Sequence, residues 1–87
     1  MINSYFLFKN IPSIDLHGEN KESAIILLNE FICDNIMLKN SIIKVVHGKG
    51  EYILKNAVHS FLKTNKYVKS YKADMFNSGV TIVEIKK

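Results

Sequence analysis

Two short stretches of the sequence combine histidine with glycine and charged residues. Asp15 and His17 stand two residues apart and are followed by Gly18, and a second stretch reads His-Gly-Lys-Gly at residues 47–50. A carboxylate beside an imidazole can fix the tautomer of the ring and orient it as a general base. Because side chains two residues apart on a strand share a face, the sequence predicts that Asp15 and His17 lie together and do acid–base chemistry.

The second stretch is suited to binding phosphate. Gly48 and Gly50 let the backbone approach an anion closely, and Lys49 between them supplies a mobile positive charge. Each His-Gly stretch also leads into an expected helix, and the N–H groups at a helix N-terminus attract anions. His47 in this second stretch, together with Asp15 and His17 in the first, completes the groups needed to cleave a phosphodiester bond.

These residues also have purely structural interpretations, which the sequence leaves open. His17 can be a buried histidine bonded to a carbonyl, Asp15 can cap a turn, and residues 47–50 can form a strand-to-helix turn without a ligand. His59, within the second expected helix, is assigned to packing or to the surface, and Tyr71 to a half-buried strand.

The elements that hold these residues alternate between strand and helix. Apolar spacing predicts a strand over 13–17, a helix with an apolar stripe from Ala24 to Met37, a strand over 42–46 buried on both faces, a helix over about 53–62, a strand over 67–76, a turn at 77–79 and a strand over 80–85. The residues assigned to the core are Ile25, Leu28, Phe31, Val58, Phe61 and Leu62.

Alternation of strand and helix implies parallel neighbours, and a short turn before the last strand implies an antiparallel hairpin. We therefore expect an α/β two-layer fold of order βαβαββ, with a four-stranded mixed sheet and both helices on one face. Both His-Gly turns then emerge at the carboxyl edge of the parallel strands, where such sheets bind ligands. Pro12 separates an N-terminal arm, residues 1–12, from the domain, residues 13–87.

Length and composition restrict the class of protein. The 87 residues suffice for one domain, and no apolar run approaches the roughly 20 residues that span a membrane. The net charge is +4, and all 12 basic residues are lysines, which neutralise phosphate but lack the bidentate fork of arginine. This favours contact with a nucleic-acid backbone over reading of bases. Cys33 is the single cysteine, which excludes an internal disulfide and fits a cytoplasmic protein.

Segments in four places resemble the Smr (small MutS-related) domain family. They are Ile-Asp-Leu-His-Gly at 14–18, Val-His-Gly-Lys-Gly at 46–50, Leu-Lys-Asn-Ala-Val at 54–58 and Gly-Val-Thr-Ile-Val at 79–83. The resemblance implies a fold similar to the C-terminal domain of translation initiation factor 3, and an activity that nicks or cleaves DNA or RNA. It maps the aspartate and histidine of the family's first motif onto Asp15 and His17, and the family's glycine turn onto residues 47–50.

Chemistry and resemblance together define the candidate site. We expect Asp15, His17 and His47 to be catalytic. The expected contacts with nucleic acid or phosphate come from Gly18, Gly48, Lys49, Gly50, Lys55, Gly79 and Thr81. Lys55 stands where the family often has an arginine, and Phe-Asn-Ser-Gly at 76–79 replaces a loop that usually carries a glycine pair.

Three functions are open on this basis: an endonuclease acting on DNA or RNA, a non-catalytic module that binds nucleic acid or the ribosome, and a binder of a small phosphorylated ligand. No tightly bound metal or other cofactor is expected, because no ligand spacing in the sequence demands one. Dependence of the activity on a divalent ion stays open. The sequence does not choose between DNA and RNA, and it does not predict the oligomeric state.

Overall fold

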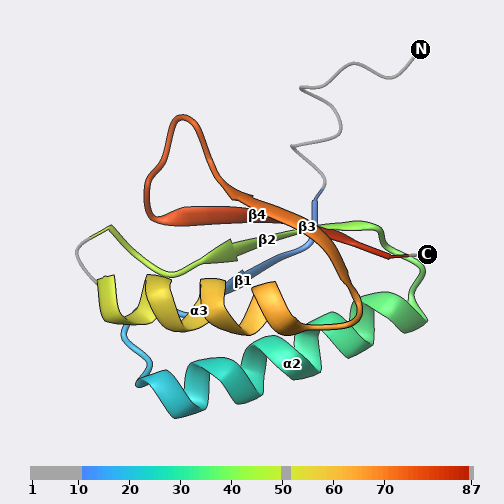
Figure 1. Cartoon of the computed structure of the whole chain (residues 1–87), viewed down its shortest axis with the longest axis horizontal. Helices are drawn as coiled ribbons and strands as arrows, with labels where there is room; N and C mark the ends of the chain where they lie inside the picture. The colour runs from blue at the N-terminus through green and yellow to red at the C-terminus, as the bar shows by residue number, and fades with distance from the viewer. Residues whose placement is uncertain (1–10, 50–51, 87) are drawn as a thin grey trace.

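The computed structural model describes residues 11–49 and 52–86, in which two helices lie against one face of a four-stranded sheet (Figure 1). The elements are, in chain order, β1 (Ser13–Asp15), α2 (Lys21–Met37), β2 (Ile42–Val46), α3 (Tyr52–Thr64), β3 (Val68–Ala73) and β4 (Val80–Ile85). The predicted two-layer fold of order βαβαββ is confirmed. Of the predicted arm, residues 1–12, only Ile11 and Pro12 lie within the described residues, and Gly50 of the predicted site lies outside them.

The strands of the sheet are ordered β1-β2-β4-β3. β1 and β2 are parallel, as expected for strands joined through a helix, and β4 is antiparallel to both of its neighbours. Asp15 lies opposite Val46, Val46 opposite Val80, and Ala73 opposite Thr81. The ends of β1, β2 and β3 and the start of β4 therefore meet at one edge of the sheet. We call this edge, marked by Asp15, Val46, Ala73 and Val80, the site edge.

The helices cover the sheet with apolar residues at helical spacing. Asn20 begins α2 as its cap by accepting the Ser23 N–H at 2.8 Å. The core consists mainly of Ala24, Leu28, Ile32, Leu54, Val58 and Leu62 from the helices and Ile43, Val45, Val83 and Ile85 from the strands. The predicted core residues Leu28, Val58 and Leu62 are buried, whereas Ile25, Phe31 and Phe61 are half-buried. Neither α2 nor α3 is long and apolar enough to cross a membrane.

Both helices lie on the same side of the sheet, so β2 is fully buried on one face only. Ile43 and Val45 are inaccessible, while Ile42, Lys44 and Val46 on the opposite face are half-buried. The prediction that this strand is buried on both faces was wrong: it rested on four β-branched residues out of five, and Lys44 at the centre of the strand lies on the side that lacks a helix.

Two strands are shorter than the apolar pattern predicted, for the same physical reason. β1 stops at Asp15, whose Oδ1 accepts the backbone N–H of His17 at 3.1 Å. β3 stops at Ala73, and Oδ1 of Asp74 accepts the backbone N–H of Phe76 at 2.9 Å. An aspartate that bonds the backbone two residues later offers that N–H an alternative to the strand ladder and turns the chain.

Candidate active site at the edge of the sheet

Asp15 and His17 form a hydrogen-bonded pair at the end of β1. Oδ1 of Asp15 lies 2.6 Å from Nδ1 of His17 and also accepts the backbone N–H of His17 at 3.1 Å. The two side chains are exposed over 56% and 70% of their surface, respectively. The hydrogen bond from the His17 side chain, and then the one from its backbone, lowers the pKa of Asp15 below the ordinary value of 3.8. Asp15 is therefore a carboxylate at neutral pH and orients the imidazole through Nδ1.

A turn, not a continuous strand, brings these two side chains together. Leu16 is fully buried, and its N–H donates to the carbonyl of Val46 at 2.7 Å. Gly18 follows with a φ of 84°, and the N–H of Glu19 donates to the carbonyl of Leu16 at 3.1 Å. The predicted proximity of Asp15 and His17 is observed, although His17 lies outside the strand. The alternative of a buried His17 is wrong, whereas Asp15 does bond the turn backbone.

The second His-Gly turn packs against the first through two glycines. Gly48 has a φ of 91°, and a Cβ at this position would lie 3.4 Å from the Cβ of His17. The carbonyl of Gly79 accepts the N–H of His47 at 2.9 Å and the N–H of Gly48 at 3.1 Å. A Cβ on Gly79 would come within 3.0 Å of the Lys49 nitrogen. The glycines therefore pack the turn at Gly48 and Lys49 between His17 on one side and Gly79 on the other, while the Gly48 N–H already donates within the protein.

Behind this turn, the hydroxyl of Thr81 links two histidines. It lies 2.9 Å from Nε2 of His47 and 2.7 Å from Nε2 of His59. Nδ1 of His47 lies 3.3 Å from the carbonyl of Gly48, to which it can only donate. Nε2 of a neutral His47 therefore accepts from the Thr81 hydroxyl, and that hydroxyl accepts from His59. His47 and Thr81 are fully buried, so this chain of hydrogen bonds joins β2, β4 and α3 beneath the surface.

Both histidines of this network are held in the neutral form. Burial lowers the pKa of His47 below its ordinary value of 6.5, and the charge of Lys55 acts in the same direction. Burial also lowers the pKa of His59, with further contributions from His47 and Lys55. The His59 ring packs edge-on against Tyr71, with 5.1 Å between the ring centroids. The network is thus a neutral, packed structure.

The structure separates the predicted site residues into a surface group and a buried group. Asp15, His17 and Lys49 are exposed. The side chains of His47 and Thr81 were also expected at the site, but they lie inside the protein. The hydrogen bond of His59 to Thr81 was not predicted from the sequence, which assigned His59 only to packing or to the surface. The available signal was its position four residues after Lys55, on the flank of the apolar stripe of α3, where a polar side chain can reach the sheet.

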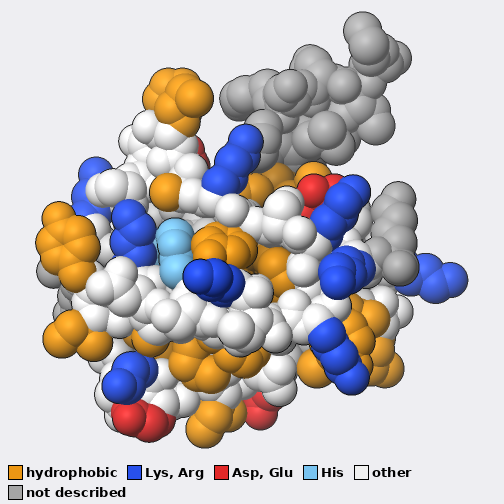
Figure 2. Space-filling view, viewed as in Figure 1, with side chains coloured by type: hydrophobic (Ala, Val, Ile, Leu, Met, Phe, Trp, Pro, Cys, Tyr) orange, Lys and Arg blue, Asp and Glu red, His pale blue; other side chains and the backbone are white. Residues whose placement is uncertain are grey.

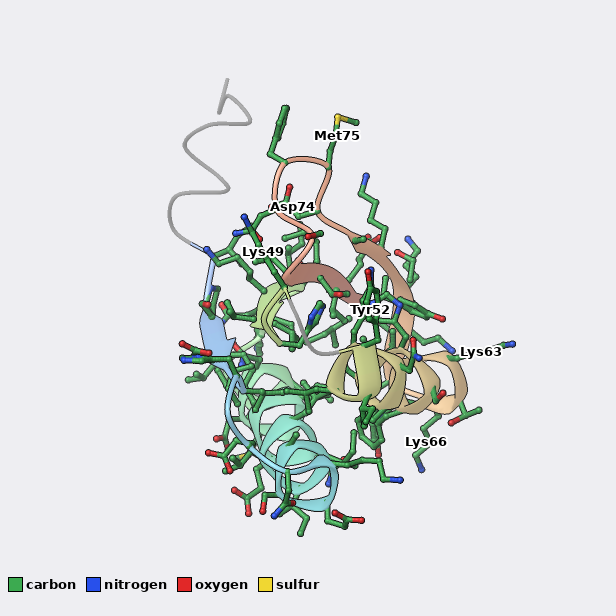
Figure 3. The ribbon with its side chains drawn as sticks, turned by 90° about the vertical axis from the view of Figure 1, so that its left-hand side faces the viewer. Lys49, Tyr52, Lys63, Lys66, Asp74 and Met75 are labelled. Atoms are coloured by element: carbon green, nitrogen blue, oxygen red, sulfur yellow. The ribbon has the colours of Figure 1, made fainter. Side chains whose placement is uncertain are left out.

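Lysines supply positive charge at the site edge, near the buried histidines and over the face of α3 and β3 (Figure 2 and Figure 3). Figure 3 looks at the site edge and shows Lys49 beside the strand ends, with Tyr52 at the start of α3. Lys55 is half-buried and lies close enough to His47 and His59 to affect their pKa values. In Figure 2, lysine side chains are spread over the face shown and acidic side chains lie towards its margins. The positive charge of the chain is therefore spread over the surface and not confined to one patch of this face (Figure 2).

The described side chains do not form a metal cluster. Within residues 11–49 and 52–86, no three histidine, cysteine, aspartate or glutamate side chains are grouped so as to hold a metal ion. The ring nitrogens of His47 are bonded to the carbonyl of Gly48 and the hydroxyl of Thr81 inside the protein. What the surface offers is a carboxylate–imidazole pair that can move a proton, with a lysine that can neutralise phosphate charge.

The chain is similar to known proteins in sequence. The model of the Smr domain matches residues 14–86. The chain is 40% identical over 77 residues to a protein named endonuclease MutS2 of Clostridium acetobutylicum, covering 85% of this chain and 10% of that protein. It is 38% identical over 76 residues to endonuclease MutS2 of Geobacillus kaustophilus, covering 84% of this chain and 10% of that protein. The chain thus spans about a tenth of the length of these curated relatives.

Solved structures share the fold. The Smr domain of Thermus thermophilus MutS2 superposes with a TM-score of 0.85 and 25% identity, covering 88% of this chain and all of that one. YdaL of Escherichia coli, a stand-alone small MutS-related protein, superposes with a TM-score of 0.81 and 21% identity, covering 86% of this chain and 64% of that one. The second similarity is one of fold alone.

Proposed function

Because the chain belongs to the Smr domain family, we propose that it binds nucleic acid and cleaves a phosphodiester bond of DNA or RNA at the Asp15–His17 pair. The observation that carries this proposal is the 2.6 Å hydrogen bond between Oδ1 of Asp15 and Nδ1 of His17 on an exposed edge of the sheet. Relatives named endonuclease MutS2 support it, although this chain matches about a tenth of their length.

The geometry assigns a role to each side of the His17 ring. Nδ1 donates to Asp15, so exchange of a proton with the substrate falls to Nε2. Nε2 accepts the proton of the attacking oxygen, from water or from a ribose 2′-hydroxyl, as the new P–O bond forms. The P–O bond to the leaving oxygen breaks, and that oxygen takes up a proton. The Asp15 carboxylate stabilises the imidazolium formed in between.

The lysines neutralise the phosphate during this reaction. Lys49 packs against Gly79 and directly follows Gly48, which contacts His17, and Lys55 lies near the buried histidines. We assign His47 and Thr81 a positioning role, because their side chains are buried and bonded to each other. Among the predicted phosphate contacts, the lysines and the exposed Gly18 turn are then the groups that meet the ligand.

Metal, partner and compartment belong to the same proposal. Asp15 and His17 form no cluster of three ligands among the described residues, so we expect no tightly bound metal, and chelation decides whether a weakly bound ion takes part. Ribosomal RNA is one source of a suitable backbone, so the ribosome is a candidate partner, tested by cosedimentation at low and high salt. The lone thiol of Cys33 is exposed and suits a reducing cytoplasm.

Cleavage of labelled single-stranded RNA and of supercoiled plasmid tests the proposal. The natural protein is compared with Asp15→Ala and His17→Ala, each with and without EDTA, and Glu30→Ala on the exposed side of α2 serves as the control. We expect both site variants to lose activity and the control to keep it. Unchanged cleavage in Asp15→Ala and His17→Ala would contradict the catalytic assignment.

Binding without cleavage favours the second function, a nucleic-acid-binding module. The observation behind it is that His47, Thr81 and the Gly48 N–H are all bonded within the protein, which leaves few groups for catalysis. If neither substrate is cut while binding stays salt-sensitive and survives His17→Ala, the site binds a backbone without reacting with it. A shallow salt dependence would instead indicate a small phosphorylated ligand.

A further inference from the structure

The face of the sheet opposite the helices carries lysines and isoleucines in a regular arrangement. Lys44 on β2 lies opposite Ile82 on β4, and Ile82 lies opposite Lys72 on β3. The three side chains therefore form a row across neighbouring strands, lysine, isoleucine, lysine. Among the described residues, neither helix packs on this face, because α2 and α3 both lie on the other (Figure 1).

Two adjoining hollows lie along this face. One, of about 440 Å³, is lined by Ile11, Lys44, Lys72, Ile82 and residues 73–76. The other, of about 360 Å³, is lined by Ile42, Lys72, Ile82, Glu84 and residues 70–71. They share Lys72 and Ile82, so together they form one shallow groove across the sheet, with a mostly apolar floor and lysines on it.

The loop after β3 adds exposed apolar side chains to one end of this groove. Phe76 and Met75 are exposed over 91% and 88% of their surface. Oδ1 of Asp74 accepts the N–H of Phe76 at 2.9 Å, and Oδ1 of Asn77 accepts the N–H of Gly79 at 2.9 Å. The loop is thus braced at both ends, and Figure 3 shows Met75 at its tip, away from the helices. Large apolar groups held in water in this way mark a binding surface.

The charges on and beside the groove have a small positive excess, which favours an anionic ligand: the described residues supply Lys44, Lys72 and Lys69 against Asp74 and Glu84. Oδ1 of Asp74 accepts the backbone N–H of Phe76. Glu84 at the far end is occupied by Lys69, at 3.6 Å, and by the hydroxyl of Ser70, at 3.2 Å. The apolar floor and the aromatic ring of Phe76 can contact bases, and the lysines beside the floor can contact the phosphates between those bases. A single strand presents its bases in this way, whereas a duplex hides them.

The groove leads to the proposed active site on the same side of the sheet. Asp15 lies opposite Val46, which is two residues from Lys44 on β2, so the backbone registers put Asp15 and Lys44 on one face. From β3 to β1 the sheet crosses three strand spacings, about 14 Å, which a few nucleotides of single strand can span. A single-stranded nucleic acid lying on this face of the sheet can therefore reach the Asp15–His17 pair without passing around an edge of the sheet.

We propose that the uncovered face of the sheet, with Lys44, Lys72 and the loop at 74–76, is the track along which a single-stranded nucleic acid lies as it enters the Asp15–His17 site, with one base stacked on Phe76. This inference rests on the proposed function and specifies its substrate as single-stranded. It also assigns a binding role to residues that lie outside the His-Gly turns.

The test measures binding of a short single-stranded RNA or DNA carrying a fluorescent label. Phe76→Ala is expected to weaken binding about 5- to 30-fold, because stacking of a base on an aromatic ring is lost, and Phe76→Tyr is expected to restore it. Lys44→Ala combined with Lys72→Ala is expected to lower the slope of log affinity against log salt by about 1.4, since each lost contact with a single strand removes about 0.7.

Matched controls separate this track from charge and exposed apolar surface in general. Lys63→Ala combined with Lys66→Ala removes two exposed lysines, one in the last turn of α3 and one just after the helix, both labelled in Figure 3. Met37→Ala removes a methionine exposed over 81% of its surface at the end of α2. These variants are expected to bind with nearly natural affinity. Because all the altered side chains except Lys44 are exposed, far-UV circular dichroism is expected to show intact folding.

The outcomes distinguish the track from the proposed function. Natural affinity in Phe76→Ala and in the double lysine variant, together with cleavage that depends on His17, would overturn the track and leave the proposed function standing. Failure of the natural protein to bind any single or double strand would overturn both. If Phe76→Ala instead lowers the molar mass in sedimentation equilibrium while oligonucleotide affinity is unchanged, the groove joins two copies of the chain and the track is wrong.

Discussion

Oδ1 of Asp15 accepts two hydrogen bonds from a single residue, His17, one from Nδ1 of its ring at 2.6 Å and one from its backbone N–H at 3.1 Å. The backbone bond closes the turn that ends β1, and the ring bond fixes the tautomer, so one carboxylate both shapes the loop and orients the imidazole. Two hydrogen bonds thus join the pair although both side chains are exposed.

Asp15→Asn separates the charge of the carboxylate from its geometry. The amide oxygen can still accept both N–H groups, but it cannot stabilise an imidazolium, so we expect kcat to fall about 10²- to 10⁴-fold with little change in KM. Steady-state cleavage of labelled RNA or plasmid measures this, with Asp34→Asn on the exposed side of α2 as the control. A natural kcat in Asp15→Asn would show that the charge of Asp15 has no part in the reaction.

The fold was largely predictable from the sequence because its strands and helices differ clearly in apolar spacing. The bounds of β2 and β4 agree with the prediction, and the parallel pairing of β1 with β2 follows from the helix between them. The ends of β1 and β3 were not predictable from this spacing. At Asp15 and Asp74 a side chain competes for a backbone N–H, and apolar periodicity contains no information on that competition.

The candidate site was predictable only where its residues are neighbours in the chain. Asp15 and His17 are two residues apart, so their contact could be expected. Thr81 and His59 are 22 residues apart and meet because β4 pairs with β2 in one register while α3 crosses beneath. That register and crossing are tertiary features, so the burial of His47 and the role of His59 required the structure.

Thr81→Val tests the buried network. Valine matches the shape of threonine but leaves Nε2 of His47 and of His59 without a partner, so we expect the free energy of unfolding to fall by about 2–4 kcal/mol. Thr81→Ser keeps the hydroxyl and loses one methyl group, so its expected cost is about 1 kcal/mol. Urea unfolding of both variants measures the difference. Equal stability of Thr81→Val and the natural protein would mean that the hydroxyl contributes nothing.

The neutral buried histidines predict a loss of stability in mild acid. Burial lowers the pKa of His47 and His59 in the folded protein below 6.5, so the unfolded chain binds protons first as the pH falls. Their contribution to stability is complete above the unfolded pKa and is lost below it, as the pH falls towards the folded values. Each histidine lowers the free energy of unfolding by about 1.4 kcal/mol per pH unit in this window.

Urea unfolding from about pH 7.5 to about pH 5.5 measures this slope. His59→Gln retains an Nε2 donor for Thr81 and cannot be protonated. The slope of its free energy of unfolding against pH is therefore expected to be smaller, by at most the contribution of one bound proton, about 1.4 kcal/mol per pH unit. An equal slope in His59→Gln and the natural protein would assign the acid sensitivity to other groups.

Gly79→Ala is expected to disturb the active site through the backbone alone. An added Cβ would meet the carbonyl carbon of Gly48 at 2.9 Å and the nitrogen of Lys49 at 3.0 Å, and neither atom can move without shifting the turn that follows β2. We expect a loss of about 1–3 kcal/mol in the free energy of unfolding and a fall in nucleic-acid affinity, because Lys49 is displaced. Gly18→Asn is the matched control: a Cβ at Gly18 meets nothing within 4 Å, and asparagine tolerates its φ of 84°, so the expected cost is below about 1 kcal/mol. Urea unfolding of both variants measures the steric cost, and oligonucleotide binding of Gly79→Ala is compared with that of the natural protein. Equal losses of stability in the two variants would refute the special role of the contact between Gly79 and the second His-Gly turn.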